Sequence, residues 1–300
     1  MTLEEINTNN RRALESRSQY SFDDWRVMPG YRGFVDIAID GCPAFVMFCN
    51  DDDIIAKSYL HKGPNAFEGQ SLRVWSQLAK SHDVIFDVGA FTGIYALAAA
   101  AVNPRAKVLA IEPAANNFHR LAANVVANGF GERVGCIQIA LGDRRQALDL
   151  HHPDGIYVLS SGESLLPNQP RRTWYSERVE VMRADDLPKA YARNPRPFVV
   201  LLDPSIAKLI KIDVEGFETR VVKGFGRLLQ RNQPTFVIEC LGIEPFRSVS
   251  RLLEPYSYRS RFIDDLGGTL HQDEERFKAH PANVLFWALD PAVEALIQGK

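Results

Sequence analysis

Two short segments of this sequence place acids directly after apolar runs, a pattern that can bind a ligand or perform chemistry. In the first, Val84-Ile85-Phe86 leads into Asp87-Val88-Gly89-Ala90-Phe91-Thr92-Gly93. In the second, Ile210-Lys211-Ile212 leads into Asp213-Val214-Glu215-Gly216. Glycines in such loops let the backbone turn sharply and approach a ligand closely. Both segments therefore predict strand ends that border a binding site.

The first loop differs from the fingerprint of a dinucleotide site. That fingerprint, G-x-G-x-x-G, places a pyrophosphate at a helix N-terminus. This loop has glycines only at Gly89 and Gly93, with an acid before them at Asp87. A carboxylate suits a cationic or hydroxylated ligand, and S-adenosylmethionine carries an ammonium, a sulfonium and a ribose diol but no phosphate. The loop therefore favours a methyl donor, although the same spacing also closes ordinary strand-to-helix turns.

Two further strand ends also carry acids. The run 107–111 ends at Glu112, which can accept hydrogen bonds from both hydroxyls of a ribose. The run 136–141 leads to Asp143, whose carboxylate can accept from an adenine amino group. The alternative interpretation of each acid is a helix N-cap or an exposed turn residue.

Regular elements explain how these acids come together. Strands and helices alternate over 83–88, 93–102, 106–111, 116–127, 135–141, 209–213, 217–230 and 235–239. Such alternation predicts an α/β fold with parallel strands, right-handed crossovers and helices on both faces of the sheet. Ligands of such sheets bind outside the carboxyl ends of the strands. Two later strands, 256–262 and 283–289, predict an antiparallel terminal hairpin.

The chain divides into two predicted parts. Residues 1–67 form an N-terminal extension whose strands 34–39 and 44–48 make a hairpin around Asp40-Gly41, and this extension packs on the core. Residues 68–300 form the main domain, which opens with a helix over 68–80. Within it, 151–205 is rich in Pro, Ser and Arg and predicts a substrate-recognition insertion. Val179 to Met182 predicts an edge strand, while 198–202 fits either a strand or a short buried helix.

Composition narrows the class of protein. A chain of 300 residues with 46% hydrophobic and 24% charged residues is typical of a globular protein, and it contains no run of eighteen apolar residues. The N-terminus lacks the pattern of a secretory signal, so we expect a cytoplasmic protein. A net charge of -2 without a basic cluster argues against a nucleic-acid partner. The four cysteines lack metal-ligand spacing and are expected to be reduced. Oligomeric state stays open.

Several segments together resemble the FkbM family of S-adenosylmethionine-dependent methyltransferases. The resemblance covers about 83–243 and implies a Rossmann-like, seven-stranded sheet, mostly parallel with a reversed last strand. It also implies S-adenosyl-L-methionine as cofactor and methylation of a hydroxyl group on a sugar, a glycan or a secondary metabolite. The segments that carry the resemblance are Asp87 to Gly93, Glu112-Pro113, Asn124 to Gly129, Ala140 to Asp143 and Ile210 to Glu218.

The resemblance also implies a set of cofactor residues. Asp87, Gly89 and Gly93 would hold the methionine end, Glu112 the ribose and Asp143 the adenine. The family's usual Asn after Ala90 is here Phe91, which removes a side-chain hydrogen bond at that position. The full predicted set is Asp87, Gly89, Ala90, Phe91, Thr92, Gly93, Glu112, Pro113 and Asp143.

Methylation of a hydroxyl needs a base, and the second acidic segment can provide it. Asp213 or Glu215 is the nearest candidate base, and Glu239 at the next strand end could orient the acceptor. The structural alternative is that Asp213 caps the following helix while Glu215 or Glu218 complements its dipole, worth roughly 0.3 to 1 kcal/mol each.

A metal-assisted reaction is the less favoured variant. Asp213 and Glu239 could flank Mg²⁺ from neighbouring strand ends. Cys240, however, stands where a catechol-type methyltransferase offers an Asn, so the sequence lacks a third hard ligand. We therefore predict no metal site.

Two other functions compete with a methyltransferase that acts on a small molecule. An NAD-dependent oxidoreductase would share the strand-loop-helix opening and the acid 19 residues after Gly93, but the missing middle glycine and Asp87 argue against it. A non-catalytic cofactor-binding protein is the second alternative. A nucleobase N-methyltransferase would carry an Asn- or Asp-Pro-Pro-aromatic motif where this chain has Asp213-Val214-Glu215-Gly216.

Overall fold

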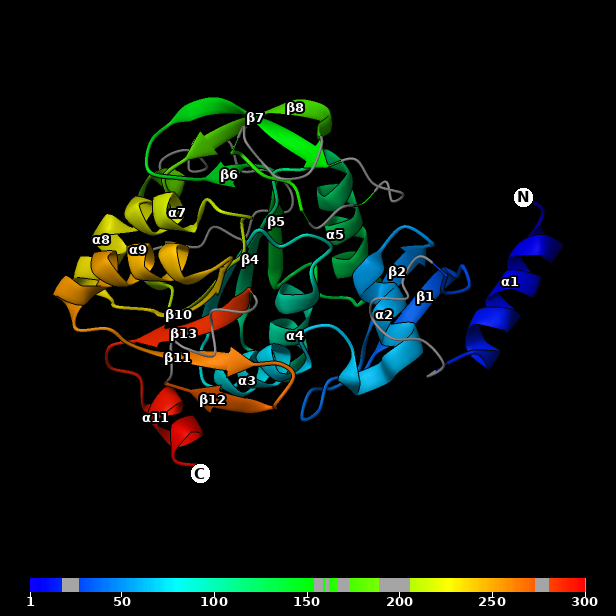
Figure 1. The fold of residues 1–300 in the computed structure, drawn as a ribbon, viewed down its shortest axis with the longest axis horizontal. Coiled ribbons are helices and arrows are strands. Elements are labelled where there is room, and N and C mark those ends of the chain that lie inside the picture. The colour runs from blue at the N-terminus through cyan, green and yellow to red at the C-terminus, as the bar shows by residue number, and fades with distance from the viewer. Residues whose placement is uncertain are drawn as a thin grey trace.

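The centre of the molecule is one large sheet (Figure 1). The computed structural model describes residues 1–17, 27–153, 159, 162–166, 173–188, 206–272 and 281–299. The sheet has eight strands in the order β12-β11-β13-β10-β9-β3-β4-β5. Their bounds are β3 Val84–Val88, β4 Lys107–Ile111, β5 Val134–Ile137, β9 Leu209–Ile212, β10 Thr235–Cys240, β11 Arg259–Asp264, β12 Thr269–His271 and β13 Ala282–Trp287.

Strand directions confirm the predicted Rossmann-like fold. Strands β5, β4, β3, β9 and β10 pair in parallel, whereas β13, the last strand along the chain, pairs antiparallel with both β10 and β11. The predicted antiparallel pairing of β11 with β13 is therefore confirmed, although β12 follows β11 along the chain and forms the hairpin with it. The sheet is one strand wider than the predicted seven, because the short strand β12 adds to its edge against β11.

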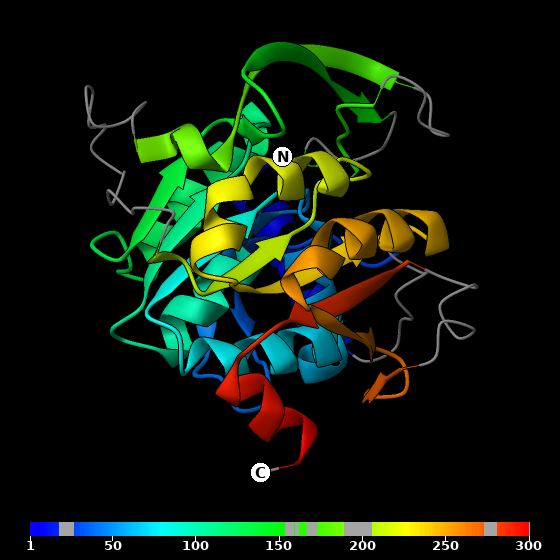
Figure 2. The same cartoon turned by 90° about the vertical axis from the view of Figure 1, so that its left-hand side faces the viewer.

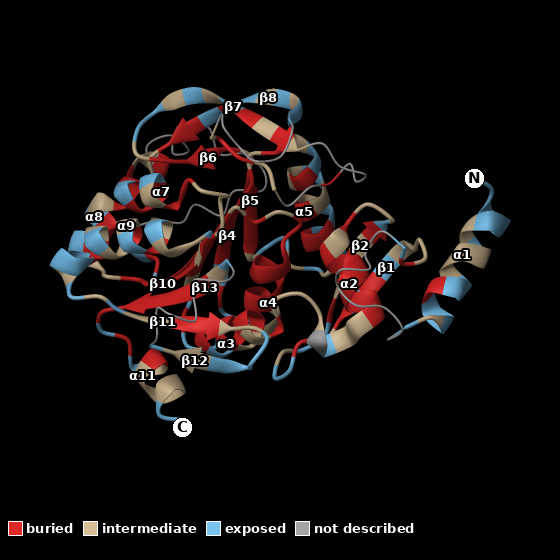
Figure 3. Cartoon of the chain, viewed as in Figure 1, coloured by how far each residue is buried: buried red, intermediate tan, exposed pale blue. Residues whose placement is uncertain are grey.

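Helices cover both faces of this sheet, as Figures 1 and 2 show from two sides. Successive strand residues point to opposite faces, so Ile85 belongs to one hydrophobic cluster and Phe86 to the other. The central strands are buried, which Figure 3 shows in red. The helices packed on the first cluster include α3 Gly69–Ala79, α4 Ile94–Val102 and α5 Ala115–Ala127, and those on the second include α7 Glu218–Gly224, α8 Gly226–Arg231 and α9 Ile243–Leu253.

Two predicted elements are divided in the structure. The strand expected over 135–141 ends at Ile137, and β6 (Ala140–Leu141) instead pairs with β8 (Thr173–Met182) in a second sheet of order β6-β8-β7. Strand β7 is Gln146–Pro153. The helix expected over 217–230 is divided into α7 and α8 at Phe225. The strand expected at Val179 to Met182 is present as part of β8, but its predicted edge position is wrong, because β8 lies between β6 and β7. Residues 198–202 lie outside the described residues.

The N-terminal extension forms the predicted hairpin, with β1 (Arg32–Ile37) antiparallel to β2 (Phe45–Asn50). Helix α5 fixes β2 through amide side chains. Asn124 Oδ1 accepts the N–H of Phe48 at 2.8 Å, and Asn128 bonds both the N–H and the carbonyl of Val46. The hairpin is thus attached to the core by hydrogen bonds to backbone. The other elements are α1 Leu3–Glu15, α2 Ile54–Lys62, η2 Gly63–Asn65, η3 Ala184–Asp186, η5 Glu254–Tyr256 and α11 Pro291–Ile297.

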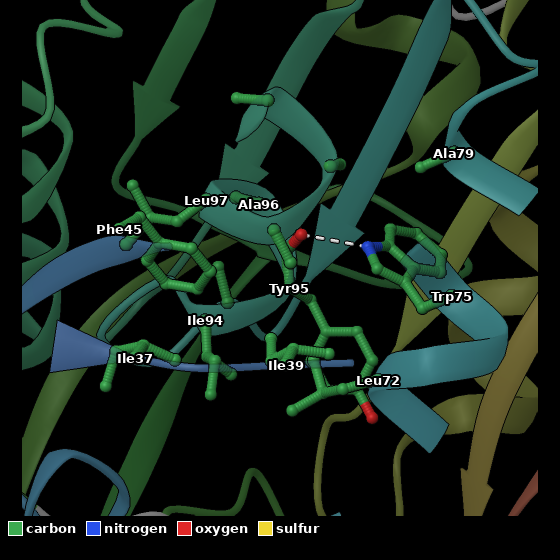
Figure 4. Close-up of a cluster of buried hydrophobic side chains, with 14 of the residues drawn as sticks. Ile37, Ile39, Phe45, Leu72, Trp75, Ala79, Ile94, Tyr95, Ala96 and Leu97 are labelled. Atoms are coloured by element: carbon green, nitrogen blue, oxygen red, sulfur yellow. Dashed lines mark hydrogen bonds between the residues drawn. The ribbon is translucent and has the colours of Figure 1, made fainter. Parts of the chain in front are cut away.

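Apolar side chains also pack between the N-terminal hairpin and the main domain (Figure 4). Ile37 and Phe45 of the hairpin belong to one buried cluster with Ile94 and Leu97 of α4. Trp75 Nε1 donates to the carbonyl oxygen of Tyr95 at 2.9 Å, which ties α3 to the start of α4. The extension therefore shares the core of the main domain.

Two expectations from composition can be examined in the structure. Cys49, Cys136 and Cys240 are buried and Cys42 is half-buried, and all four are free thiols. Across the described part of the chain, no helix combines the length and the apolar character needed to cross a membrane.

Candidate functional site

A cavity lies at the carboxyl ends of the central strands. Residues of β3, β4 and β10 line it, together with residues of the loops after β3, β4 and β9. Ile55 and Phe67 of the N-terminal extension and Leu165 of the segment 162–166 complete the wall. Six carboxyl groups and no lysine, arginine or histidine occur among the described lining residues. The acids are Glu68, Glu112, Glu163, Asp213, Glu215 and Glu239.

The glycine loop packs directly on the second acidic segment. Gly89 has a φ of 78°, and a Cβ at this position would lie 1.6 Å from the carbonyl oxygen of Asp213. The N–H groups of Gly89 and Ala90 donate to the carbonyl of Ile111 at 2.9 and 3.0 Å. Only a glycine allows this close approach. The two motifs found in the sequence therefore form one wall of one cavity.

Glu112 shapes the loop and faces the cavity. Its two carboxylate oxygens accept the N–H groups of Phe91 and Ala114, each at 2.8 Å. The side chain of Asn117 also hydrogen-bonds this carboxylate. A carboxylate can accept about four hydrogen bonds, so one position remains for a ligand. Burial, and then the neighbouring Glu163, raise the pKa of Glu112 well above its usual value. A cationic or hydroxyl-bearing ligand would relieve this buried negative charge.

Asp87, Thr92 and Gly93 belong to the predicted cofactor set but do not line the cavity. Asp87 is buried and accepts the N–H of Ala96, in the first turn of α4, at 2.9 Å. Burial raises the pKa of Asp87 to about 7. Thr92 is buried and its carbonyl accepts Nδ2 of Asn124 at 2.9 Å, while Gly93 has a φ of 103° at the start of α4. These residues hold the loop in place.

Asp143, the predicted adenine contact, lies outside the lining of the cavity. It follows β6 into the second sheet. Within the described residues its Oδ1 is buried without a hydrogen-bond partner. Ile139, Ala140 and Leu141 line the cavity instead, together with Pro113. An apolar surface thus stands where the sequence predicted a carboxylate.

The turn after β9 projects acids into the cavity, where Asp213, Glu215 and Glu239 all line the wall as predicted. Glu215 has a φ of 51°, an uncommon left-handed conformation for a side chain of its size. Glu218 stabilises this turn by accepting the N–H groups of Val214 at 3.3 Å and Gly216 at 2.9 Å. Burial raises the pKa of Glu218 to about 7. Glu218 is therefore a structural acid and Glu215 is presented to the cavity.

Glu68 adds a third acid to the predicted pair of Asp213 and Glu239. One carboxylate oxygen from each lies within 4.8 Å of the others. The sequence analysis predicted that a third hard oxygen ligand is lacking, and this prediction is wrong, because Glu68 provides one from the start of α3. Glu68 could not be found from the strand-end pattern because it precedes the first strand of the sheet.

Lys211 is the second residue that the sequence analysis missed. It is fully buried in the middle of β9, and its Nζ lies 2.9 Å from Oδ2 of Asp213 and 4.8 Å from the ring centroid of Tyr95. The Tyr95 hydroxyl donates to Glu68 Oε2 at 2.5 Å. A lysine between isoleucines in a buried strand was the available signal.

The segment 162–166, which is bridged to β7 of the second sheet, lines one side of the cavity. Glu163 lines the cavity and lies 3.4 Å from Nδ1 of His152, whose Nε2 lies 2.9 Å from Glu177. Burial alone would lower the pKa of His152, but the two glutamates raise it. His152 also stacks on Tyr175. Part of the predicted recognition insertion therefore reaches the site.

Comparison with known proteins gives the class of this site. The model of the methyltransferase FkbM domain matches residues 87–260, more than half of the chain. The chain belongs to the FkbM methyltransferase family. Methyltransferase sdnD of Sordaria araneosa is 28% identical over 199 residues, which cover 58% of this chain and 73% of that protein.

The chain is also similar to solved structures, at low sequence identity. Methyltransferase FkbM from Methylobacillus flagellatus is 18% identical with a TM-score of 0.42, over 69% of this chain and 44% of that one. The match thus spans less than half of that crystallised chain. The O-methyltransferase TomG from Streptomyces achromogenes, solved with S-adenosylmethionine, is 12% identical with a TM-score of 0.40, over 74% and 80% of the two chains.

Proposed function

We propose that this FkbM methyltransferase uses S-adenosylmethionine to methylate a hydroxyl group of a sugar, a glycan or a secondary metabolite. The observation that carries the proposal is the charge of the cavity beside the glycine loop. Six carboxyl groups and no basic side chain line it among the described residues. Such a wall attracts a sulfonium and an ammonium and repels a pyrophosphate. The same observation disfavours the alternative of an NAD-dependent oxidoreductase.

The residues present fit this cofactor along the length of the cavity. Gly89, which tolerates no Cβ, would let the methionine end lie against the backbone. Glu112 retains an acceptor position for a ribose hydroxyl. Ile139 and Leu141 offer an apolar surface for the adenine ring. Asp87 and Gly93 would act indirectly, because they fix the loop and the start of α4.

The reaction would occur at the end of the cavity lined by Asp213, Glu215 and Glu239. When bound, S-adenosylmethionine supplies an already activated methyl group that an acceptor oxygen can attack in line. The chain must therefore align the acceptor, exclude water and take the hydroxyl proton. Asp213 or Glu215 would accept this proton. Burial, with Asp213 and Glu68 nearby, raises the pKa of Glu239 well above its usual value, while Lys211 opposes this rise. Glu239 would orient the acceptor by hydrogen bonding.

Polar groups at this end support a hydroxylated acceptor. Glu68, Glu215 and Glu239 can each accept or donate hydrogen bonds to hydroxyl groups, as sugars and oxygenated natural products require. An acceptor that bears a carboxylate or phosphate would meet the same repulsion as a pyrophosphate. We therefore expect neutral, polyhydroxylated acceptors.

Separate measurement of binding and turnover tests the proposal. Glu215→Ala should bind S-adenosylmethionine with wild-type affinity in calorimetry but lose methyl transfer to a panel of sugar and polyketide alcohols. Glu244→Ala, which removes an exposed glutamate at the start of α9, is the matched control and should leave both unchanged. A fall in cofactor affinity of Glu215→Ala as large as its fall in methyl transfer would contradict the assignment of roles.

A further inference from the structure

Lys211 stands out because its charge is buried in a strand that is otherwise apolar. Its side chain is 1% exposed. In the register of the sheet it lies beside Asp87 of β3 and Val237 of β10. A buried ammonium is destabilising unless opposite charges and hydrogen bonds compensate it. The acids around Lys211 must therefore be part of the reason it is tolerated there.

These acids are the ones that border the acceptor end of the cavity. The ammonium bonds Asp213 at 2.9 Å and lies over the ring of Tyr95, whose hydroxyl bonds Glu68. Oxygens of Glu68, Asp213 and Glu239 lie within 4.8 Å of one another. Three carboxyl groups at this spacing would repel one another strongly in the absence of a cation.

We propose that Lys211 is the built-in counter-ion of Glu68, Asp213 and Glu239, taking the electrostatic role that a divalent cation has in metal-assisted methyltransferases. It would also position Asp213, because one ammonium hydrogen bond fixes the carboxylate oxygen next to the cavity. Lys211 is a positioning residue in this account, since Asp213 lies between it and the acceptor.

The effect of Lys211 on neighbouring acids supports this role. Burial raises the pKa of Glu68 to about 7, and Lys211 opposes this rise, as it does for Asp87 and Glu239. Burial alone would lower the pKa of Lys211, but Asp213, Glu68 and Glu239 raise it above its usual value. Lys211 thus interacts both with Asp87, which does not line the cavity, and with Glu68 and Glu239, which do. A divalent ion would compete for the Asp213 oxygen that the ammonium already uses.

Mn²⁺ binding distinguishes a counter-ion from a bystander. Free Mn²⁺ would be followed by electron paramagnetic resonance with wild type, Lys211→Ala, Lys211→Arg and the double variant Lys211→Ala/Glu68→Gln. The proposal predicts no binding to wild type or Lys211→Arg at millimolar Mn²⁺, one ion per chain in Lys211→Ala, and weaker binding in the double variant. One tightly bound ion in wild type, or none in a folded Lys211→Ala, would overturn it.

A second measurement keeps the proposal testable if Lys211→Ala does not fold. Melting temperatures would be compared for Lys211→Met, Asp213→Asn and the double variant. We expect Lys211→Met to lower the melting temperature by about 5 to 8 °C, and Asp213→Asn in that background to restore at least half of the loss. Simple addition of the two losses would mean that Lys211 only packs, and would overturn the proposal. Both experiments omit cofactor and acceptor, so their failure is distinguishable from failure of the proposed function.

Discussion

The hydroxyl of Ser164 lies 2.7 Å from the carbonyl oxygen of Glu215, and it donates to that oxygen. This bond joins the second sheet to the turn that presents the proposed base. Ser164 also forms a backbone bridge with His151 of β7, and Leu166 lies over Gly216. Contacts with β7 and with the turn after β9 therefore fix the segment 162–166, which forms one side of the cavity.

Removal of the Ser164 hydroxyl should impair turnover more than cofactor binding. Ser164→Ala leaves the partly buried carbonyl of Glu215 with one hydrogen bond fewer, at a cost of about 0.5 to 1.5 kcal/mol. We expect roughly a tenfold fall in kcat/KM for the acceptor and an unchanged affinity for S-adenosylmethionine. Ser176→Ala is the matched control, because Ser176 contacts only the exposed ring of His151 among the described side chains. Similar kinetics in the two variants would contradict a role for this bond.

Asp87 should matter for the cofactor although it does not line the cavity. Asp87→Ala leaves the N–H of Ala96 without its acceptor and loosens the start of α4. We expect affinity for S-adenosylmethionine to fall by about 100-fold, equivalent to about 2.7 kcal/mol. Asp83→Ala, at the exposed start of the same strand, is the control and should bind normally. Calorimetry would measure both, and wild-type affinity in Asp87→Ala would show that the loop does not depend on this acid.

Binding of a cationic cofactor should release protons. Burial and Glu163 raise the pKa of Glu112, and a sulfonium and an ammonium in the cavity would favour its ionised form. Affinity should therefore rise with pH through the raised pKa of the free protein. Calorimetry in buffers of different ionisation enthalpy would measure the released protons. Glu112→Gln should release fewer protons than wild type, and proton uptake on binding would contradict this electrostatic account.

The core of the fold was predictable because local signals agreed with the tertiary structure. Asp40-Gly41 marks the hairpin, and alternating strands and helices predict the parallel sheet. The strand expected over 135–141 was predicted too long, since continuous apolar residues do not reveal that Ala140 and Leu141 pair with β8. Apolar runs specify burial but not which sheet a strand joins.

The site was predictable only where its residues follow strand ends. Glu112, Asp213 and Glu239 line the cavity as expected. Glu68 and Glu163 arrive from distant segments, so only the tertiary structure brings them to it. Asp87 was expected to contact the cofactor. In the structure its carboxylate instead accepts the N–H of Ala96 and does not line the cavity. Spacing identifies a loop more readily than the direction of each side chain.

A pH-dependent contact should anchor the C-terminal helix. His82 Nε2 lies 3.1 Å from Oδ2 of Asp290, the N-cap of α11. Burial alone would lower the pKa of His82, but Asp290 and the Leu78 carbonyl raise it above 6.5. Burial alone would raise the pKa of Asp290, but His82 and Thr235 lower it below 3.8.

The signs of these shifts define the pH window. The His82 contribution is fully present below pH 6.5 and is lost as pH rises through the raised folded pKa, whereas the Asp290 contribution is present above pH 3.8 and is lost as pH falls. His82→Gln should lower the free energy of unfolding by about 3 kcal/mol within this window and by less above it. Chemical denaturation at several pH values would measure this, with the exposed His119→Gln as control. A difference in the free energy of unfolding between wild type and His82→Gln that stays the same at every pH would contradict a role for this ion pair.

We propose that the acid-lined cavity selects a cationic methyl donor over a dinucleotide. Calorimetric titration of the purified protein with S-adenosylmethionine, and separately with NAD⁺, with and without EDTA, tests it most directly. We predict micromolar binding of S-adenosylmethionine alone, unchanged by EDTA. Binding of NAD⁺ alone, or of neither compound, would contradict the account.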